Sequence, residues 1–278
     1  MAVIQHQLAV VTGAAGGMGS AIARAFASQG WSLVLSDLHE APLAALATEL
    51  RGSATVTIVP GDVTNPEYAA RIIAALGGLK AGALVHAAGV SPTMADGKRI
   101  VMINFTATKI LVEALLPHIA PGGTAVLIAS NSGQIFARPI VDRSVKKLLA
   151  GRFSLLARLM LRSSRTAYPL SKRAVQLYAQ AMSPAFGQAN ARIVSLSPGI
   201  IDTEMGRREQ RAGPEMDKMI AATPLGRSGR AEEIASVVSF LVSPAASYIT
   251  GTDILVDGGT IAGIDAAGGV MKLMSKRA

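Results

Sequence analysis

The stretch LAVVTGAAGGMGSAIARAFASQG, residues 8–30, decides the fold. It starts with a short apolar run, passes through a turn rich in glycine, and continues with apolar residues at helical spacing. Glycines between a strand and a helix allow a sharp turn and let the backbone approach a pyrophosphate closely, and the N-terminus of the helix favours negative charge. The stretch therefore predicts a β-strand, a dinucleotide-binding turn and a helix. Taken alone, a glycine-rich turn is also compatible with a plain loop.

The same alternation of strand and helix continues along the chain. Further short apolar runs occur at 32–37, 55–62, 83–89, 124–130, 191–199 and 253–259, with helical spacing of apolar residues between them. Continuous apolar strands that alternate with helices predict a parallel sheet of about seven strands with helices on both faces. We therefore expect an α/β, Rossmann-type doubly wound fold, with residues 1–278 forming one domain. In such a sheet, ligands bind beyond the carboxyl ends of the strands.

Composition and charge exclude several classes of function. The chain has no Cys, and its four His are scattered, so neither a disulfide nor a metal site is expected. No signal sequence is evident at the N-terminus, which predicts a cytoplasmic protein. The net charge is +9, and Asp and Glu are absent from 143–201. Because the basic segment 143–165 lacks the repeated aromatic interleaving of a base-stacking surface, we expect no nucleic-acid partner.

The end of the second predicted strand indicates which dinucleotide binds. Asp37 follows Gly19 by 18 residues. A carboxylate at this place accepts hydrogen bonds from the adenosine ribose hydroxyls and repels a 2′-phosphate. No Lys or Arg occurs in LVLSDLH, residues 33–39. The sequence therefore favours NAD(H) over NADP(H).

A Tyr and a Lys stand four residues apart in TAYPLSKRAV, residues 166–175. At the start of a predicted helix, this spacing places Tyr168 and Lys172 on one face. An ammonium beside a phenol favours the ionised phenolate. The pair is a candidate acid–base device.

Together, these motifs resemble the short-chain dehydrogenase/reductase family. The glycine turn, Asp62-Val63, the HAAG of 86–89, Pro198-Gly199 and the segment 223–259 each match a family motif. His86 and Ala87 stand where the family usually has asparagines, which puts a structural hydrogen bond in doubt. The resemblance implies an NAD(H)-dependent oxidoreductase that interconverts a secondary alcohol and a ketone. It also implies a homo-oligomer that acts on a small molecule.

The resemblance also assigns the catalytic residues. Tyr168 would act as acid and base, Lys172 would tune it and hold the nicotinamide ribose, and Asn104 would connect the lysine to water. Ser130 would orient and polarise the carbonyl, with Ser132 as its rival for this role. A sensor or scaffold that binds NAD(H) without catalysis is the alternative, because a fold does not fix a function.

The resemblance further implies a set of residues that bind the cofactor. These are Gly13, Gly17, Met18, Gly19, Asp37, Asp62, Val63, Ala88, Gly89, Tyr168, Lys172, Pro198, Gly199, Ile201 and Thr203.

One segment departs from the family pattern. Thirty-seven residues separate Ser130 from Tyr168, where the family has about a dozen, so we expect a helical insertion at about 136–166. Its apolar residues predict one helical stripe despite a central Gly151: Val145, Leu148, Leu149, Leu156, Leu159 and Met160. An insertion at this place is similar to that of bacterial 3α-hydroxysteroid dehydrogenase/carbonyl reductases. It implies a hydrophobic substrate, such as a hydroxysteroid or an alicyclic alcohol.

Three interpretations of the insertion remain open. It packs on its own domain or on a neighbouring subunit, it forms an apolar lid for a bulky substrate, or it contacts a membrane surface as a cationic amphipathic helix. The segment 204–222 is expected to be a loop that shapes the same pocket.

Overall fold

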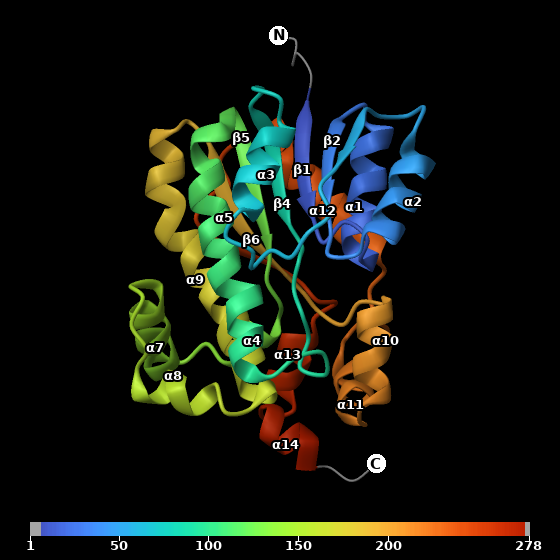
Figure 1. Cartoon of the computed structure of the whole chain (residues 1–278). Coiled ribbons are helices and arrows are strands. Elements are labelled where there is room, and N and C mark those ends of the chain that lie inside the picture. The colour runs from blue at the N-terminus through green and yellow to red at the C-terminus, as the bar shows by residue number, and fades with distance from the viewer. Residues whose placement is uncertain (1–6, 276–278) are drawn as a thin grey trace.

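A parallel seven-stranded sheet forms the centre of the protein (Figure 1), whose computed structural model describes residues 7–275. The strand order is β3-β2-β1-β4-β5-β6-β7, and every pairing is parallel. The strands are β1 (Leu8–Thr12), β2 (Ser32–Ser36), β3 (Val56–Ile58), β4 (Ala81–His86), β5 (Ile119–Ile128), β6 (Arg192–Pro198) and β7 (Asp253–Val256). All seven predicted strands are confirmed, and so is the doubly wound α/β class. The order reverses between β1 and β4, which makes their carboxyl ends the switch point of the sheet.

Helices cover both faces of this sheet (Figure 1). One apolar core lies between the sheet and α1, α2 and α12, and the other lies between the sheet and α3, α4, α5 and α9. These helices are α1 (Gly17–Ser28), α2 (Glu40–Leu50), α3 (Tyr68–Ala75), α4 (Gly97–Val101), α5 (Thr108–Leu115), α9 (Ser164–Gln188) and α12 (Ala231–Val242). Val10 of β1 pairs with Val34 and Leu84, and all three are buried. Burial on both faces explains why the strands read as continuous apolar runs.

The remaining helices gather at the carboxyl ends of the strands, at the lower end of Figure 1. They are α6 (Ser132–Ile135), α7 (Pro139–Leu149), α8 (Leu155–Met160), α10 (Glu204–Arg211), α11 (Glu215–Ala222), α13 (Thr260–Ala266) and α14 (Val270–Ser275). The prediction of a loop at 204–222 was wrong, because most of this segment forms α10 and α11. Thr203 caps α10 by accepting a hydrogen bond from the backbone N–H of Gly206 at 3.1 Å.

A π-helical segment, η1 (Met102–Ala107), joins α4 to α5. Single π-helical turns inside α-helices frequently mark functional sites. Within the described residues, the stretch Gly97–His118 is the one helix long and apolar enough to cross a membrane, and half of it is buried inside the protein. Phe105 and Leu111 of this stretch belong to the core beside α9, so its packing is that of a core helix.

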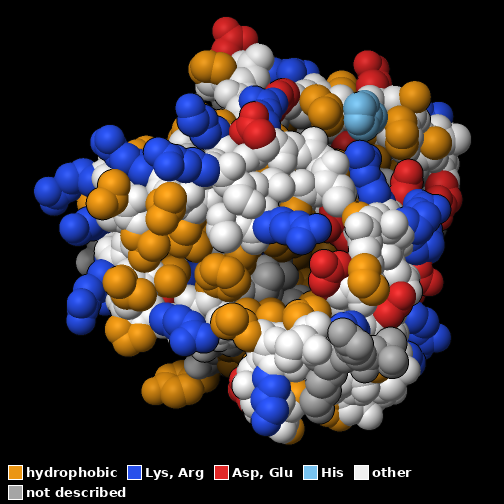
Figure 2. Space-filling view, turned by 90° about the horizontal axis from the view of Figure 1, so that it is seen from below, with side chains coloured by type: hydrophobic (Ala, Val, Ile, Leu, Met, Phe, Trp, Pro, Cys, Tyr) orange, Lys and Arg blue, Asp and Glu red, His pale blue; other side chains and the backbone are white. Residues whose placement is uncertain are grey.

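The insertion forms two helices, so the prediction of one continuous stripe was wrong. Gly151 has φ +72°, a left-handed conformation that ends the helical path after α7. Val145, Leu148 and Met160 are buried as the stripe predicted, whereas Leu159 is 57% exposed. The left side of Figure 2, where α7 and α8 lie, shows apolar side chains rimmed by Lys and Arg. Contact of this surface with a membrane stays a prediction.

An ion pair fastens the insertion to the helix that carries Tyr168. Arg173 of α9 donates to both carboxylate oxygens of Asp142 in α7, at 2.8 Å each. The hydrogen bonds from Arg173 hold the pKa of Asp142 below its ordinary value. Both side chains are mostly buried, with 14% and 28% of their surface exposed. The pair should therefore stabilise the fold more than a surface pair does.

We expect Asp142→Asn to lower the free energy of unfolding at pH 7 by about 1–2 kcal/mol. Because the pKa of Asp142 is lowered in the folded protein, its stabilising effect is present above the ordinary Asp pKa of about 4 and disappears as the pH falls. Urea unfolding at pH 7 and pH 3 measures this difference. Arg143→Gln, which removes an exposed neighbouring cation, is the control. An equal loss at both pH values would show that the ion pair is not the cause.

Candidate functional site

The glycine turn after β1 has no room for side chains. Gly13 has φ +65°, and a Cβ there would lie 2.6 Å from the backbone nitrogen of Ala88. A Cβ at Gly19 would lie 2.0 Å from the Gly13 oxygen, and one at Gly17 would lie 2.5 Å from Cγ2 of Thr203. The turn thus brings together five of the predicted cofactor residues, from the ends of β1, β4 and β6. Its backbone is open to close approach by a pyrophosphate at the N-terminus of α1.

Asp37 lies beside this turn, at the end of β2. Its Oδ2 accepts a hydrogen bond from the backbone N–H of Ala15 at 3.0 Å, and the residue is half-buried. Among the described residues, no Lys or Arg forms an ion pair with it. The carboxylate is therefore fixed against the turn while its charge is not neutralised.

Asp62 is held in a different way. Its Oδ2 pairs with Nη2 of Arg99 at 2.6 Å, and its Oδ1 accepts hydrogen bonds from the backbone and hydroxyl of Thr64. Val63 packs against the core. The placement of the adenine contact at Asp62 and Val63 stays a prediction.

His86 supplies the structural hydrogen bond that its departure from the family pattern put in doubt. Its Nδ1 lies 2.7 Å from Oγ1 of Thr12, which joins β4 to β1 just before the glycine turn. Oγ1 of Thr12 also accepts from the backbone N–H of Ala88 at 3.4 Å. Burial and the nearby charge of Lys172 lower the pKa of His86 to about 3, so the imidazole is neutral at physiological pH.

Tyr168 and Lys172 lie one turn apart in α9, on the same face. The Lys172 Nζ is 5.7 Å from the centroid of the Tyr168 ring and donates to the carbonyl oxygen of Ile128 at 3.0 Å. The prediction that Tyr168 stands at the start of the helix was wrong by one turn, since α9 begins at Ser164. The interior position gives both side chains a fixed backbone, as an acid–base pair requires.

Burial shifts the pKa values of the pair in opposite directions. Desolvation raises the pKa of Tyr168 to about 12, although a hydrogen bond with the Ser130 side chain opposes this rise. Desolvation also lowers the pKa of Lys172 to about 8. The expectation that Lys172 makes the phenol more acidic does not hold for the protein alone, because the cost of burying the phenolate charge is larger. Paired groups with strongly shifted pKa values are typical of catalytic sites.

Asn104 lies in η1 and connects the loop after β4 to α9. Its Oδ1 accepts from the backbone N–H of Val90 at 2.8 Å, while its Nδ2 donates to the Val90 oxygen at 2.9 Å and to Ser171 Oγ at 3.2 Å. A Cβ at Gly89 would lie 3.2 Å from Asn104 Oδ1 and 3.6 Å from Lys172 Nζ. Asn104 and Lys172 therefore flank the backbone of Gly89. The Asn104 side chain therefore does more than cap or kink its own helix.

The two candidate serines differ in their surroundings. The Ser130 side chain hydrogen-bonds to Tyr168 and its Oγ accepts from the backbone N–H of Ser132 at 3.2 Å. The Ser132 Oγ is buried and has no hydrogen-bond partner among residues 7–275. This arrangement favours Ser130 as the partner of the phenol.

Gln176 supports Ser130 and was not singled out from the sequence. It lies one turn beyond Lys172 in α9, is 3% exposed, and donates to the Ser130 carbonyl oxygen at 3.1 Å and to Ser197 Oγ at 2.8 Å. A Cβ at Gly133 would lie 2.7 Å from its Nε2. Gln176 thus ties the segment 130–133 to β6. Its spacing of four residues from Lys172 is the sequence signal that could have identified it.

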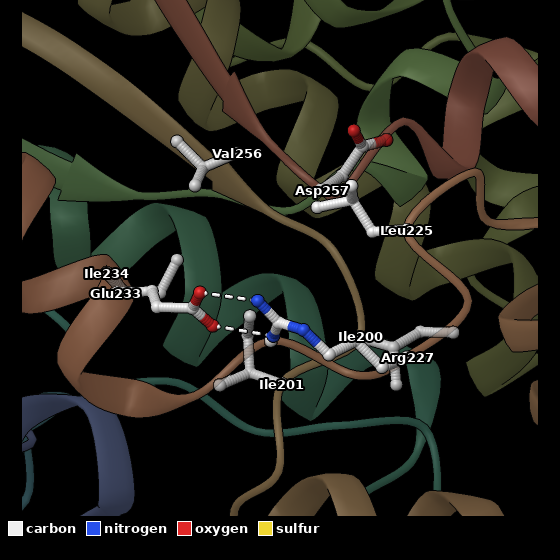
Figure 3. A pocket seen from close by; sticks show the side chains of 10 residues that line it. Ile200, Ile201, Leu225, Arg227, Glu233, Ile234, Val256 and Asp257 are labelled. Carbon is white, nitrogen blue, oxygen red and sulfur yellow. Dashed lines mark hydrogen bonds and ion pairs between the residues drawn. The ribbon is translucent and has the colours of Figure 1, made fainter.

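Pro198 ends β6, and the segment that follows carries Gly199, Ile201 and Thr203, of which Thr203 reaches Gly17 of the glycine turn. Ile201 is buried and forms a parallel bridge with Gly229. Its side chain lines a pocket of about 100 Å³ in which Arg227 and Glu233 form a bidentate ion pair (Figure 3). None of the four candidate catalytic residues lines this pocket. This pocket therefore lies beside the segment that follows β6, and the candidate site is a separate region around Tyr168.

Known proteins are similar to this chain over most of its length. Residues 7–139 match the family described as short chain dehydrogenase, and residues 152–260 match the one described as enoyl-(acyl carrier protein) reductase. Galactitol 2-dehydrogenase (L-tagatose-forming) of Cereibacter sphaeroides is 33% identical over 264 residues, which cover 90% of this chain and 93% of that protein. D-threitol dehydrogenase of Mycolicibacterium smegmatis is 29% identical over 269 residues, which cover 92% of this chain and 93% of that protein.

A solved structure is similar over the same length. It is a short-chain dehydrogenase/reductase from Brucella melitensis with the designation glucose/ribitol dehydrogenase, and it matches with a TM-score of 0.75 and 30% identity over 91% of this chain and 96% of that chain. The glycine turn, the Tyr-Lys pair and these matches over nine-tenths of the chain lead to one conclusion: this protein belongs to the short-chain dehydrogenase/reductase family.

Proposed function

We propose that this protein is an NAD(H)-dependent oxidoreductase that interconverts a secondary alcohol and a ketone. One observation carries the proposal. Tyr168 and Lys172 lie next to Ser130 and Asn104 at the carboxyl ends of β4 and β5, where the Lys172 Nζ reaches within 3.6 Å of a Cβ built on Gly89. The relatives named galactitol 2-dehydrogenase and D-threitol dehydrogenase support an alcohol as substrate.

The residues around the glycine turn fit a dinucleotide. A Cβ at Gly13, Gly17 or Gly19 would clash with neighbouring protein atoms, so the turn keeps the bare backbone that a pyrophosphate approaches closely. Asp37 provides a carboxylate for the ribose hydroxyls. Lys172 and the backbone of Gly89 would hold the nicotinamide end. When bound, NAD⁺ supplies the hydride acceptor and a positive charge close to the phenol.

Proton transfer is the work of Tyr168 in this proposal. In the oxidation direction Tyr168 first releases its own proton to solvent, and its phenolate oxygen then takes the proton of the alcohol as a hydride leaves the carbinol carbon; in the reverse direction the phenol gives its proton to the carbonyl oxygen. The Ser130 hydroxyl donates a hydrogen bond to the same substrate oxygen, where negative charge develops. The Lys172 ammonium, held by the Ile128 carbonyl, favours the phenolate that forms transiently. Asn104 fixes the loop backbone beside this lysine.

The proposed substrate is a neutral secondary alcohol on an alicyclic or steroid-like frame. Support for the apolar frame comes from the apolar residues of the insertion near the site. We further propose that the protein is cytoplasmic. We also propose that it forms a homo-oligomer, and light scattering of the purified protein tests this by measuring the mass of the assembly.

Purified protein with NAD⁺ and a panel of alicyclic alcohols and hydroxysteroids tests the proposed function through absorbance of NADH at 340 nm. We expect turnover of at least one secondary alcohol. NADH binding without turnover across the panel would favour the non-catalytic sensor instead.

Cofactor preference gives a direct prediction. Asp37→Ala should raise the Kd for NAD⁺ about tenfold, because one charged hydrogen-bond acceptor is lost. It should also weaken the discrimination against NADP⁺, because the repulsion of the 2′-phosphate disappears. Titration of NADH and NADPH by fluorescence measures both effects, with Glu40→Gln as the control for loss of a nearby exposed charge. The same ratio of affinities in wild type and Asp37→Ala would refute the role of Asp37.

A further inference from the structure

Glu209 of α10 reaches from the segment after β6 to the loop after β4. Its Oε1 accepts hydrogen bonds from Ser91 Oγ at 2.6 Å, from the backbone N–H of Thr93 at 3.2 Å and from the hydroxyl of Thr93. Among residues 7–275, its Oε2 accepts no hydrogen bond and no cation pairs with the carboxylate. Three donors therefore fix one oxygen and leave the other available as an acceptor.

This carboxylate is bound to the loop that leads to the candidate catalytic groups. Ser91 follows Val90, whose backbone is hydrogen-bonded to Asn104, and Gly89, whose backbone lies against Lys172. The charge of Glu209 also contributes to the raised pKa of Tyr168, so the two side chains share one region of the site. Figure 2 shows a hollow near the centre of this end of the molecule, with acidic and basic side chains on the side of α10 and α11.

The chemistry of an ionised carboxylate restricts what it recognises. It accepts hydrogen bonds and donates none, and it repels other anions. The Glu209 carboxylate is half-buried and has one oxygen without a hydrogen bond from the described part of the chain. A hydrogen bond to this oxygen from a neutral donor, such as a hydroxyl, is therefore the most favourable contact for a substrate. A carboxylate or phosphate on the substrate would meet like charge close to the reacting carbon.

We propose that Glu209 is a specificity-determining residue that selects neutral diols and polyols by accepting a hydrogen bond from a second hydroxyl of the substrate. This inference rests on the proposed function, because it names the substrate class for the same site. The bond between Glu209 and the loop 91–93 holds the carboxylate in position for this contact. If Glu209 only held α10 against this loop, its substitution would change kcat/KM by the same factor for every substrate.

Two pairs of alcohols separate selection from fastening: cyclohexanol with cis-1,2-cyclohexanediol, and 2-butanol with 2,3-butanediol. For each pair, the ratio of kcat/KM for the diol to kcat/KM for the mono-alcohol is measured with saturating NAD⁺. Glu209→Gln should lower this ratio about tenfold, because the charged acceptor becomes a weaker one. Glu204→Gln removes an exposed carboxylate from the same helix and should leave the ratio as in wild type.

Equal proportional losses with both members of a pair in Glu209→Gln would overturn the inference, since fastening alone predicts that result. An unchanged ratio with unchanged rates would overturn it as well. No NADH formation by wild-type protein from any of the four alcohols would count against the proposed function itself, a result distinct from the other two.

Discussion

Tyr168→Phe should lower kcat about 10³-fold and leave the Kd for NADH within about twofold of wild type. The substitution removes a single oxygen, the one that takes the proton from the alcohol. The ring keeps its place in α9, next to Lys172 at 5.7 Å. Desolvation raises the pKa of this phenol to about 12, and Phe leaves no group at this position that can exchange a proton. Steady-state kinetics and NADH fluorescence measure the two quantities.

A second tyrosine provides the matched control. Tyr178 lies in the same helix, is buried, and donates to the Lys109 carbonyl at 3.3 Å, away from Ser130. Tyr178→Phe removes the same atom from a structural position and should change kcat less than about twofold. Residual activity of Tyr168→Phe at the level of Tyr178→Phe would remove Tyr168 from the mechanism.

Lys172→Met should also abolish most turnover, by about 10²–10³-fold, because the charge that favours phenolate is lost. Unlike most core substitutions, it should leave the fold as stable as wild type or more stable at pH 7. Lys172 is 7% exposed, and desolvation lowers its pKa to about 8, which means that folding buries an unfavourable charge. An apolar side chain of similar length does not carry this cost.

The pH dependence of this effect has a definite sign. Between pH 8 and 10.5 the unfolded chain keeps the Lys172 proton while the folded protein loses it, so wild-type stability rises with pH in this range. The difference in unfolding free energy between Lys172→Met and wild type should therefore shrink from pH 8 to 10.5. Lys146→Met, at an exposed position of α7, is the control. A difference that does not change with pH would contradict the assignment of a charged, buried Lys172.

Local patterns made the fold predictable from the sequence. Buried parallel strands such as β1, β4 and β6 are continuous apolar runs. The glycines after β1 are required because a Cβ at these positions would lie as close as 2.0 Å to a backbone atom. Among the candidate catalytic residues, Ser130 follows β5, Tyr168 and Lys172 share one face of α9, and Asn104 lies in η1. Short motifs singled out all four, and they place the candidate site at the carboxyl ends of the sheet.

Features that depend on distant contacts were not predictable. The hydrogen bond between Ser91 and Glu209 spans 118 residues, and no local pattern in α10 indicates it. The direction of the Tyr168 pKa shift was missed for a similar reason, since desolvation, a property of the folded protein, is the largest cause of the raised pKa. The sequence marked Gly151 as a weak point of a helix, but its left-handed conformation, which separates α7 from α8, could be read only from the structure.

Hydride transfer to the cofactor is tested most directly by following the hydrogen atom of the carbinol carbon. A secondary alcohol turned over by the protein is labelled with deuterium at the carbinol carbon and incubated with NAD⁺, and the NADH formed is analysed by mass spectrometry. We expect NADH that is heavier by one deuterium, with one ketone formed for each NADH. NADH without the label, or ketone formed without NADH, would contradict hydride transfer at the Tyr168–Lys172 site.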